Sequence, residues 1–279
     1  MTGIIDVGGG MRGVYSAGIY DYLLDHKIEF DYGLGISAGA ANMISYLAKQ
    51  KGRNKRFYTD YILRKEYMGM GNFFKRKGYL DLNYIYGTLS NSNGEDPVDY
   101  PAFCQTKTKY LVAATDAQTG TPHYFSNRDV RQDQYDILKA SSALPIACKP
   151  FPVDDRLYFD GGIAEPIPYQ KAFADGCTRL VVILTRPRDS IRSMQSNFGL
   201  IKLLLRKYPN TIRAISERHL KYNNAVAALK KLETEGKVLI AAPKDISGMK
   251  TLTKDLQAIE KLYTDGYNDG KKIAAFVRA

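Results

Sequence analysis

The sequence predicts an α/β fold built around a mostly parallel sheet. Short apolar stretches typical of buried strands alternate with segments whose apolar residues recur at helical spacing. Near the start of the chain, a strand-like stretch, a tight turn and a helical pattern occur twice in succession. Because parallel strands need a crossover connection, usually a helix, this alternation favours a parallel sheet.

The expected strands are short and apolar. The first is Gly3 to Val7 and the second is Phe30 to Leu34. Further strands are expected at residues 110–114, 157–159, 179–185 and 237–242. Several of these are nearly continuous apolar runs, which is typical of strands covered on both faces.

The expected helices follow the strands. After the first strand, Tyr15, Ile19, Tyr22 and Leu23 fall on one helical face, and a similar apolar spacing runs from Ala40 to Leu47. Residues 197–235 are mainly helical in pattern and rich in Lys and Arg, while 252–263 and 271–277 are expected to be two closing helices.

The length and composition favour one domain. A chain of 279 residues with 44% hydrophobic residues can bury a large core, and no internal repeat or clear linker divides it. We therefore expect a single domain over 1–279, with the chemical motifs within 3–185. Residues 186–279 are expected to add a helical segment, a further strand and the C-terminal helices.

Charge and cysteine usage limit the partners. The formal net charge of +11 favours contact with an anionic partner such as phospholipid headgroups or nucleic acid. The three cysteines are widely spaced and form no CxxC motif, so neither a disulfide framework nor a zinc site is indicated. The first residues lack a charged region followed by an apolar stretch, so a cytoplasmic protein is expected.

A nucleophile motif lies between the second expected strand and its helix. Residues Gly35-Ile36-Ser37-Ala38-Gly39 match G-x-S-x-G in the strand–turn–helix context that this motif requires. Gly35 and Gly39 remove Cβ atoms that would collide with the neighbouring strand and helix, so the Ser37 hydroxyl projects from the sheet. The alternative is an ordinary glycine-rich turn, but we take Ser37 as the candidate nucleophile.

A glycine loop follows the first expected strand. Gly8, Gly9 and Gly10, with Arg12 and Gly13, leave successive backbone N–H groups free to point at an anion. This geometry suits an oxyanion hole, which uses the loop and the Ser37 turn in one site.

A second interpretation of the glycine loop is dinucleotide binding, since its glycines satisfy G-x-G-x-x-G. The acidic residues Glu29 and Asp31 lie near the next strand-like stretch, where such a site needs a carboxylate for the ribose. This interpretation predicts a Rossmann-type oxidoreductase but leaves the Ser37 turn unexplained. A plain tight turn is the third possibility.

The base that activates the serine is open on local evidence. The chain has three histidines, His26, His123 and His219, and an order of Ser37, Asp160, His219 matches α/β-hydrolase triads. The alternative is an Asp that acts directly on the serine. Asp160 is followed by Gly161 and Gly162, which allow a close approach, although Asp-Gly alone is more typical of a hairpin turn.

The three motifs together resemble the patatin-like phospholipase family. The glycine loop, the Ser37 motif and the Asp160-Gly161-Gly162 motif occur in the order and contexts of that family. Two blocks between them support the resemblance, residues 113–120 and residues 140–151. It covers roughly residues 3 to 185.

The resemblance implies a three-layer α/β/α fold and hydrolysis of lipid acyl esters by a Ser-Asp dyad without histidine. On this basis Ser37 is the acylated residue, Asp160 the general base, and Gly9 and Gly10 the oxyanion donors, with Arg12 shaping their loop. It also implies that the reaction needs no metal or organic cofactor. At Asp160 the resemblance therefore favours a catalytic base over a hairpin turn.

Two segments combine apolar and basic residues as an interfacial lipid-binding surface would. They are Phe73 to Tyr79 and Leu200 to Lys207. Aromatic residues in the core and a solvated basic face would give the same pattern, and no motif supports nucleic-acid binding. A non-catalytic membrane-surface protein with a hydrolase fold is therefore a further alternative. The oligomeric state is unknown.

Overall fold

The computed structural model describes residues 1–69, 71–72, 78–246 and 248–279. Its strands are β1 (Thr2–Asp6), β2 (Tyr32–Ile36), β3 (Lys109–Asp116), β4 (Pro122–Ser126), β5 (Phe151–Val153), β6 (Arg156–Asp160), β7 (Arg179–Ile183) and β8 (Val238–Ala241). Its α-helices are α1 (Val14–Asp25), α2 (Ala38–Leu47), α3 (Arg53–Thr59), α5 (Tyr100–Cys104), α6 (Asp136–Ser141), α7 (Tyr169–Ala174), α8 (Phe198–Leu204), α9 (Pro209–Thr234) and α10 (Leu256–Arg278). Short helical turns are η1 (Gly10–Gly13), η2 (Tyr61–Leu63), η3 (Tyr84–Thr88) and η4 (Asn127–Asp129).

The strands form one eight-stranded sheet in the order β5-β6-β3-β2-β1-β7-β8, with β4 also paired to β3. The five strands β3, β2, β1, β7 and β8 are parallel to one another. The pairs β3–β4, β3–β6 and β5–β6 are antiparallel. The prediction of a mostly parallel sheet is therefore confirmed.

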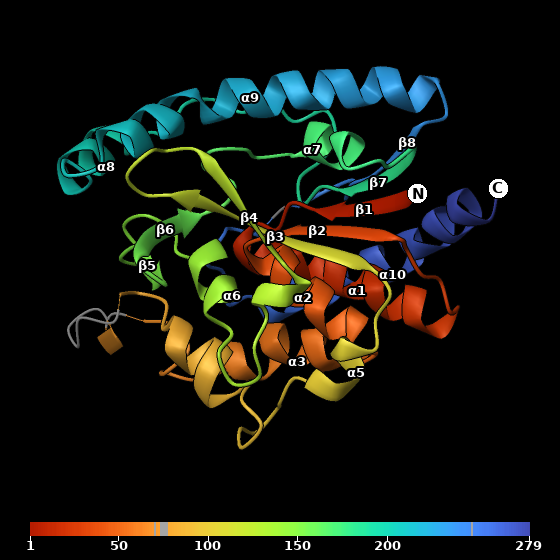
Figure 1. Ribbon diagram of the computed structural model, residues 1–279, viewed down its shortest axis with the longest axis horizontal. Coiled ribbons are helices and arrows are strands. Elements are labelled where there is room, and N and C mark those ends of the chain that lie inside the picture. The colour runs from red at the N-terminus through yellow and green to blue at the C-terminus, as the bar shows by residue number, and fades with distance from the viewer. Residues whose placement is uncertain (70, 73–77, 247) are drawn as a thin grey trace.

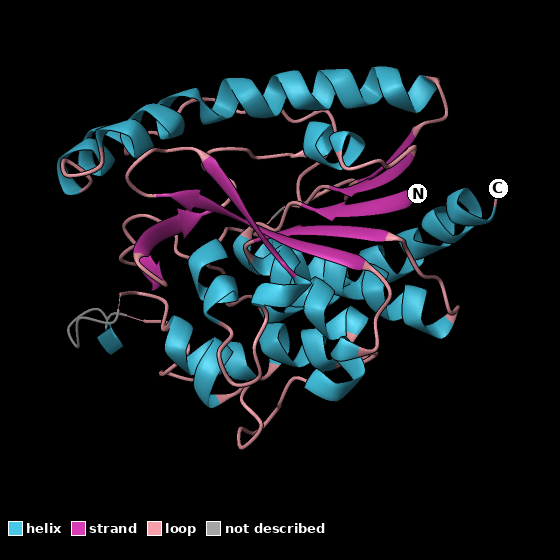
Figure 2. Cartoon of the chain, viewed as in Figure 1, coloured by secondary structure: helices cyan, strands magenta, loops and turns pink. Residues whose placement is uncertain are grey.

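Helices cover both faces of this sheet (Figure 1). The helices α7 and α9 lie along one face, and α1, α2 and α10 lie along the other, with α3 and α5 beyond them (Figures 1 and 2). This is the three-layer α/β/α arrangement. The termini of β1 and α10 lie on the same side of the molecule (Figure 1).

The central strands divide the core into two large clusters. On β1, Ile4 belongs to the cluster shared with α1, α2 and α10, while Ile5 belongs to the cluster shared with α9. Because successive side chains of a strand point to opposite faces, a strand covered on both sides must be apolar throughout. This explains why these strands are continuous apolar runs.

The structure corrects several strand predictions. The second strand is Tyr32–Ile36 and not Phe30 to Leu34, so Ser37 follows the strand directly. The antiparallel strands β4 and β5 were not predicted. Both contain proline and half-exposed residues, so they lack the apolar signal of the parallel strands.

The two expected closing helices form one continuous helix, α10. The prediction divided it near Gly266 and Gly270. Both glycines pack against α1, where a Cβ at Gly266 would lie 1.9 Å from the Tyr15 carbonyl oxygen and one at Gly270 would lie 2.6 Å from Tyr22. Tertiary packing thus requires small residues and holds the helix together despite the weak helix propensity of glycine.

The expected basic helical region at 197–235 forms α8 and the long helix α9. Residues 73–77 of the expected surface segment Phe73 to Tyr79 lie outside the described residues. Within the described parts of the chain, none of the helices combines the length and the apolar character needed to span a bilayer.

Candidate active site

Ser37 occupies a strained turn between β2 and α2. Its backbone has φ 55° and ψ −131°, and its side chain is 6% exposed. Few non-glycine residues adopt a positive φ, and such strain is concentrated at functional positions. The strand and the helix approach so closely at this turn that a Cβ on Gly35 would lie 2.4 Å from the Ala40 Cα atom. The turn therefore places Ser37 at the carboxyl ends of the parallel strands.

The glycine loop lies beside this turn at the end of β1. Gly8, Gly9 and Gly10 all have positive φ values, of 61°, 135° and 61°. The Gly8 N–H donates to the Asp6 carboxylate at 3.0 Å, and the Gly8 carbonyl accepts a hydrogen bond from the Thr185 hydroxyl. Among the described residues the N–H groups of Gly9 and Gly10 have no hydrogen-bond acceptor. These two donors are available to an oxyanion, whereas that of Gly8 is not.

Asp160 ends β6 with its carboxylate near the Ser37 hydroxyl. Its side chain is 2% exposed, and burial raises its pKa. The cation of Arg218, the neighbouring Ser37 hydroxyl, and the Gly162 N–H, which donates to Asp160 Oδ1 at 2.9 Å, each lower this pKa. A carboxylate whose pKa is raised by burial is a stronger base than an exposed one.

Two supporting residues were missed by sequence reasoning. The Ser141 hydroxyl accepts the Ser37 N–H at 2.8 Å and donates to the Ala113 carbonyl at 2.6 Å, so it ties the turn to β3. Asp6 is fully buried between the glycine loop and the Ser37 turn, and burial raises its pKa to about 6. Gly39 permits this approach, since a Cβ there would lie 2.5 Å from the Asp6 carboxylate.

One cavity of about 780 Å³ brings most of the predicted site residues together. Its described lining includes Gly8, Gly9, Gly10, Arg12, Ser37, Asp160 and Gly162. Gly13 and Gly161 allow close packing instead. A Cβ on Gly13 would lie 2.6 Å from the Tyr58 hydroxyl oxygen, and one on Gly161 would lie 2.2 Å from the Ala113 carbonyl oxygen. The structure thus separates the glycines that face the cavity from those that hold its walls.

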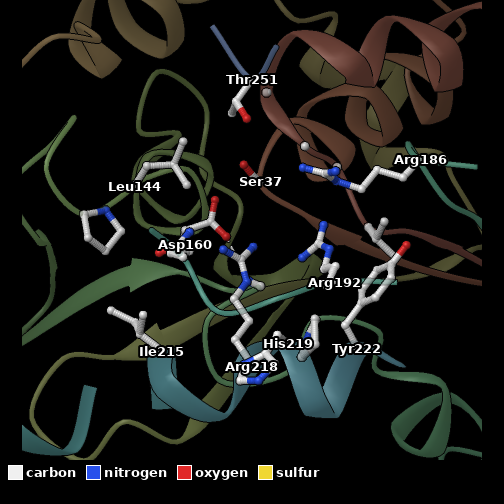
Figure 3. A pocket seen from close by; sticks show the side chains of 18 of the residues that line it. Ser37, Leu144, Asp160, Arg186, Arg192, Ile215, Arg218, His219, Tyr222 and Thr251 are labelled. Carbon is white, nitrogen blue, oxygen red and sulfur yellow. Dashed lines mark hydrogen bonds between the residues drawn. The ribbon is translucent and has the colours of Figure 1, made fainter. Parts of the chain in front are cut away.

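Basic residues from the C-terminal part complete the cavity. Figure 3 shows Arg218 extending from α9 toward Asp160, with Arg186 and Arg192 approaching from a neighbouring wall. Thr251 lies at the opposite side and accepts a hydrogen bond from the Arg12 guanidinium at 3.2 Å. The sequence around Arg218 predicts a solvated helix face. Its role could not be inferred locally, because its neighbours in the sequence are ordinary charged helix residues.

The histidines differ in position. His219 lines the cavity, and its Nδ1 is buried without a hydrogen-bond partner among the described residues. His123 lies on β4 and packs against Phe125, and His26 stacks on Tyr22 at the end of α1. Neither of these two lines the cavity. The structure therefore leaves His219 as the histidine that a triad would have to use.

The positions of Glu29 and Asp31 do not fit the dinucleotide-binding interpretation. Glu29 and Asp31 precede β2, and the Asp31 carboxylate accepts the Thr2 N–H at 2.8 Å, at the amino ends of the parallel strands. The glycine loop lies at their carboxyl ends. Because a ribose-binding carboxylate must lie at the same end as the glycine loop, this pair cannot serve that role.

Comparison with known proteins identifies two sequence regions. The sequence model described as patatin-like phospholipase matches residues 7–173. A second model, described as a domain of unknown function, matches residues 208–277. The second region contains Arg218 and Thr251, so the cavity draws its wall from both.

One curated relative and one solved structure are similar to this chain. The uncharacterized protein YjjU of Escherichia coli (strain K12) is 30% identical over 183 residues, which are 64% of this chain and 50% of that protein. The crystal structure of VipD from Legionella pneumophila has a TM-score of 0.54 at 14% identity and covers 98% of this chain and 66% of that one. The chain thus spans about half the length of YjjU, and the likeness to VipD supports the fold.

Proposed function

Because this chain belongs to the patatin-like phospholipase family, we propose that it is a serine acyl hydrolase that cleaves fatty-acyl esters of lipids through Ser37 and Asp160. The observation that carries the proposal is the buried Asp160 carboxylate in the same cavity as a serine on a strained turn, beside two backbone N–H groups that have no acceptor among the described residues. This combination supplies a nucleophile, a base and an oxyanion hole.

In the proposed reaction Asp160 takes the Ser37 proton as Oγ attacks the ester carbonyl. The N–H groups of Gly9 and Gly10 stabilise the negative charge on the carbonyl oxygen of the tetrahedral intermediate. When this collapses, the alcohol leaves with the proton from Asp160, and the acyl group stays on Ser37. Asp160 then takes a proton from a water molecule as its oxygen attacks the acyl carbonyl. The bond to Ser37 Oγ breaks, Asp160 returns the proton to Oγ, and the fatty acid leaves.

A narrow apolar pocket next to Ser37 supports a lipid acyl group as the substrate. It has a volume of about 70 Å³ and shares Ser37 and Gly10 with the larger cavity. Its apolar lining includes Met11, Ile44, Phe57, Met68, Leu80, Ile85, Val98 and Leu138. The lining also includes the polar residues Arg53, Asn54 and Ser90, but it is mainly apolar, as is typical of ligand sites. We propose that the acyl chain enters here while the alcohol part of the ester occupies the larger cavity.

A fluorophosphonate probe tests the proposed function directly. We expect stoichiometric covalent labelling of the full chain, mapped by peptide mass spectrometry to the peptide that contains Gly35 to Gly39. Prior unfolding of the protein should remove the labelling, because the hydroxyl depends on the folded site. Labelling at another residue would place the site elsewhere. An unreactive chain that still binds lipid vesicles would support a non-catalytic membrane-surface protein.

We further propose that the protein contacts an anionic membrane surface through the segment 191–207. Leu203 is 65% exposed on α8, and Leu200 and Leu204 are also exposed, whereas Ile201 and Leu205 are buried. Ile191 is 85% exposed and lines the cavity, as does Met194, so this apolar surface borders the cavity entrance. The nearby exposed cations are Lys202, Arg206 and Lys207. Apolar and basic groups together are typical of interfacial binding.

Vesicle sedimentation should show tighter binding to anionic than to neutral vesicles, with a difference that salt reduces. The double variant Leu203→Glu/Leu204→Glu should weaken binding about tenfold or more, since it replaces two apolar contacts with charges that anionic lipid repels. The control is Leu63→Glu, an exposed leucine on η2 that should leave binding unchanged. Equal binding to both vesicle types at low salt would mean that the basic residues only solubilise the protein.

A further inference from the structure

Four arginines from distant parts of the chain face the proposed catalytic cavity. Arg12 comes from η1, Arg186 and Arg192 from the segment after β7, and Arg218 from α9. Among the described residues that line the cavity, Asp160 is the one carboxylate. The cavity therefore holds a large excess of positive charge, and Figure 3 shows three of the guanidinium groups around the space next to Ser37.

Among the described residues these guanidinium groups form no ion pair, although Arg218 lies close enough to Asp160 to affect its pKa. In the described residues none of the four lies within 4.0 Å of a carboxylate oxygen, and the Nε atom of each is buried without a hydrogen-bond partner. Arg12 is only 4% exposed and donates to the neutral Thr251 hydroxyl, and Arg192 lies over the Tyr222 ring at 4.0 Å. Buried charges are normally paired, so this arrangement leaves donors available for a ligand.

The cluster is unfavourable in the absence of an anion. Burial, together with the positive charges of Arg186 and Arg218, lowers the pKa of Arg12 to about 10 and that of Arg192 to about 9. Like charges this close destabilise one another, and the effect is strongest where water is excluded. A bound anion would remove this repulsion.

Ester hydrolysis itself does not require so many cations. The backbone donors of Gly9 and Gly10 suffice for the oxyanion, and Arg218 is the cation that most lowers the pKa of Asp160. Arg192 adds to this effect on Asp160, and neither Arg186 nor Arg192 accepts or donates a proton in those steps. Their guanidinium groups do have the planar, bidentate geometry that suits phosphate oxygens.

We propose that the larger cavity binds a doubly negative phosphate on the alcohol part of the substrate, so that the enzyme prefers anionic phospholipids with a terminal phosphate over zwitterionic ones. This inference rests on the proposed acyl hydrolase function. Ser37 lies where the apolar pocket meets the basic cavity, which places the acyl chain on one side of the ester and the phosphate on the other. A choline headgroup would bring an ammonium group among the guanidinium groups, where it is repelled.

The test compares lysophosphatidic acid with lysophosphatidylcholine of the same short acyl chain, both below the concentration at which they form micelles. Monomeric substrates separate recognition in the cavity from attraction of the protein to a charged surface. We expect kcat/KM to be at least about tenfold higher for the anionic lipid, since a charge-assisted contact contributes roughly a factor of ten or more. Equal kcat/KM values for the two lipids would overturn the proposal.

Arginine variants locate the effect. Arg186→Gln and Arg192→Gln should each reduce the ratio of kcat/KM between the two lipids by about tenfold, because each removes one charged contact with the phosphate. The matched control is Arg213→Gln, which removes an exposed arginine of α9 that pairs with Glu217 and should keep the wild-type ratio. A preference that survives in both cavity variants would also overturn the proposal.

Binding without turnover separates this inference from the proposed function. Glycerol 3-phosphate should raise the Tm of the Ser37→Ala variant, and the Arg186→Gln and Arg192→Gln changes in that background should remove the rise. If no ester is hydrolysed but this rise is seen, the anion site stands and the hydrolase function fails. If inorganic phosphate accelerates hydrolysis of lysophosphatidylcholine instead of inhibiting hydrolysis of the anionic lipid, the site takes a free anion and the headgroup assignment is wrong.

Discussion

Replacing Ser37 with alanine is expected to abolish hydrolysis of a short p-nitrophenyl ester while leaving the fold intact. Without Oγ no acyl-enzyme can form, so kcat/KM should fall by at least about 10⁴-fold. The fold should tolerate the change because the turn is held by backbone contacts, notably the Ser37 N–H to the Ser141 hydroxyl. Alanine adopts the positive φ at Ser37 with about the same strain as serine.

The measurement is the steady-state rate of ester hydrolysis with circular dichroism as the check of folding. The matched control is Ser216→Ala, which removes a serine on α9 that hydrogen-bonds the Arg213 carbonyl and should retain wild-type activity. Substantial turnover by the folded Ser37→Ala variant would exclude Ser37 as the nucleophile.

Replacing Asp160 with asparagine is expected to stop acylation of Ser37 as completely as Ser37→Ala does. In a dyad the carboxylate itself receives the serine proton, and an amide cannot. In a triad a histidine would carry the proton and Asp160 would only orient it. His219 lines the cavity, so it is the histidine that a triad would use, but its buried Nδ1 has no hydrogen-bond partner among the described residues. We therefore expect His219→Ala to stay within about threefold of wild type.

The rate of acylation by the phosphonate probe decides between the two arrangements. It is measured for Asp160→Asn, His219→Ala and, as a control outside the cavity, His123→Ala. Thermal unfolding of Asp160→Asn is needed as well, because the change leaves Arg218 without its nearest negative charge. A folded His219→Ala variant as inactive as Ser37→Ala would refute the dyad.

The pH dependence of the activity is a second test of Asp160 as the base. Only the ionised carboxylate of Asp160 accepts the serine proton, so activity should fall as the pH falls through the pKa of Asp160. Burial raises that pKa, so the midpoint of the fall should lie above the ordinary Asp value of about 3.9. Arg218→Gln removes a cation that favours the carboxylate and should move the midpoint to higher pH, whereas His219→Ala should leave it in place.

Features that depend on neighbouring residues in the sequence were predictable. The strand–turn–helix context of Ser37 and the glycine run at Gly8 to Gly10 are local, because both are determined by which residues can adopt a positive φ at a tight turn. The parallel strands were also predictable, because burial on both faces requires continuous apolar runs. The ends of the strands were predicted less accurately. The second strand was expected at Phe30 to Leu34, whereas β2 begins and ends two residues later.

The sequence alone determined the α/β sheet and the turn at Ser37, because backbone sterics and apolar burial act over a few residues. Tertiary structure decided the continuity of α10, where contacts with Tyr15 and Tyr22 outweigh the low helix propensity of Gly266 and Gly270. It also decided that Arg218 faces Asp160 and not solvent. Electrostatic interactions depend on distances in space, and segments far apart in the sequence contribute the charges of this cavity.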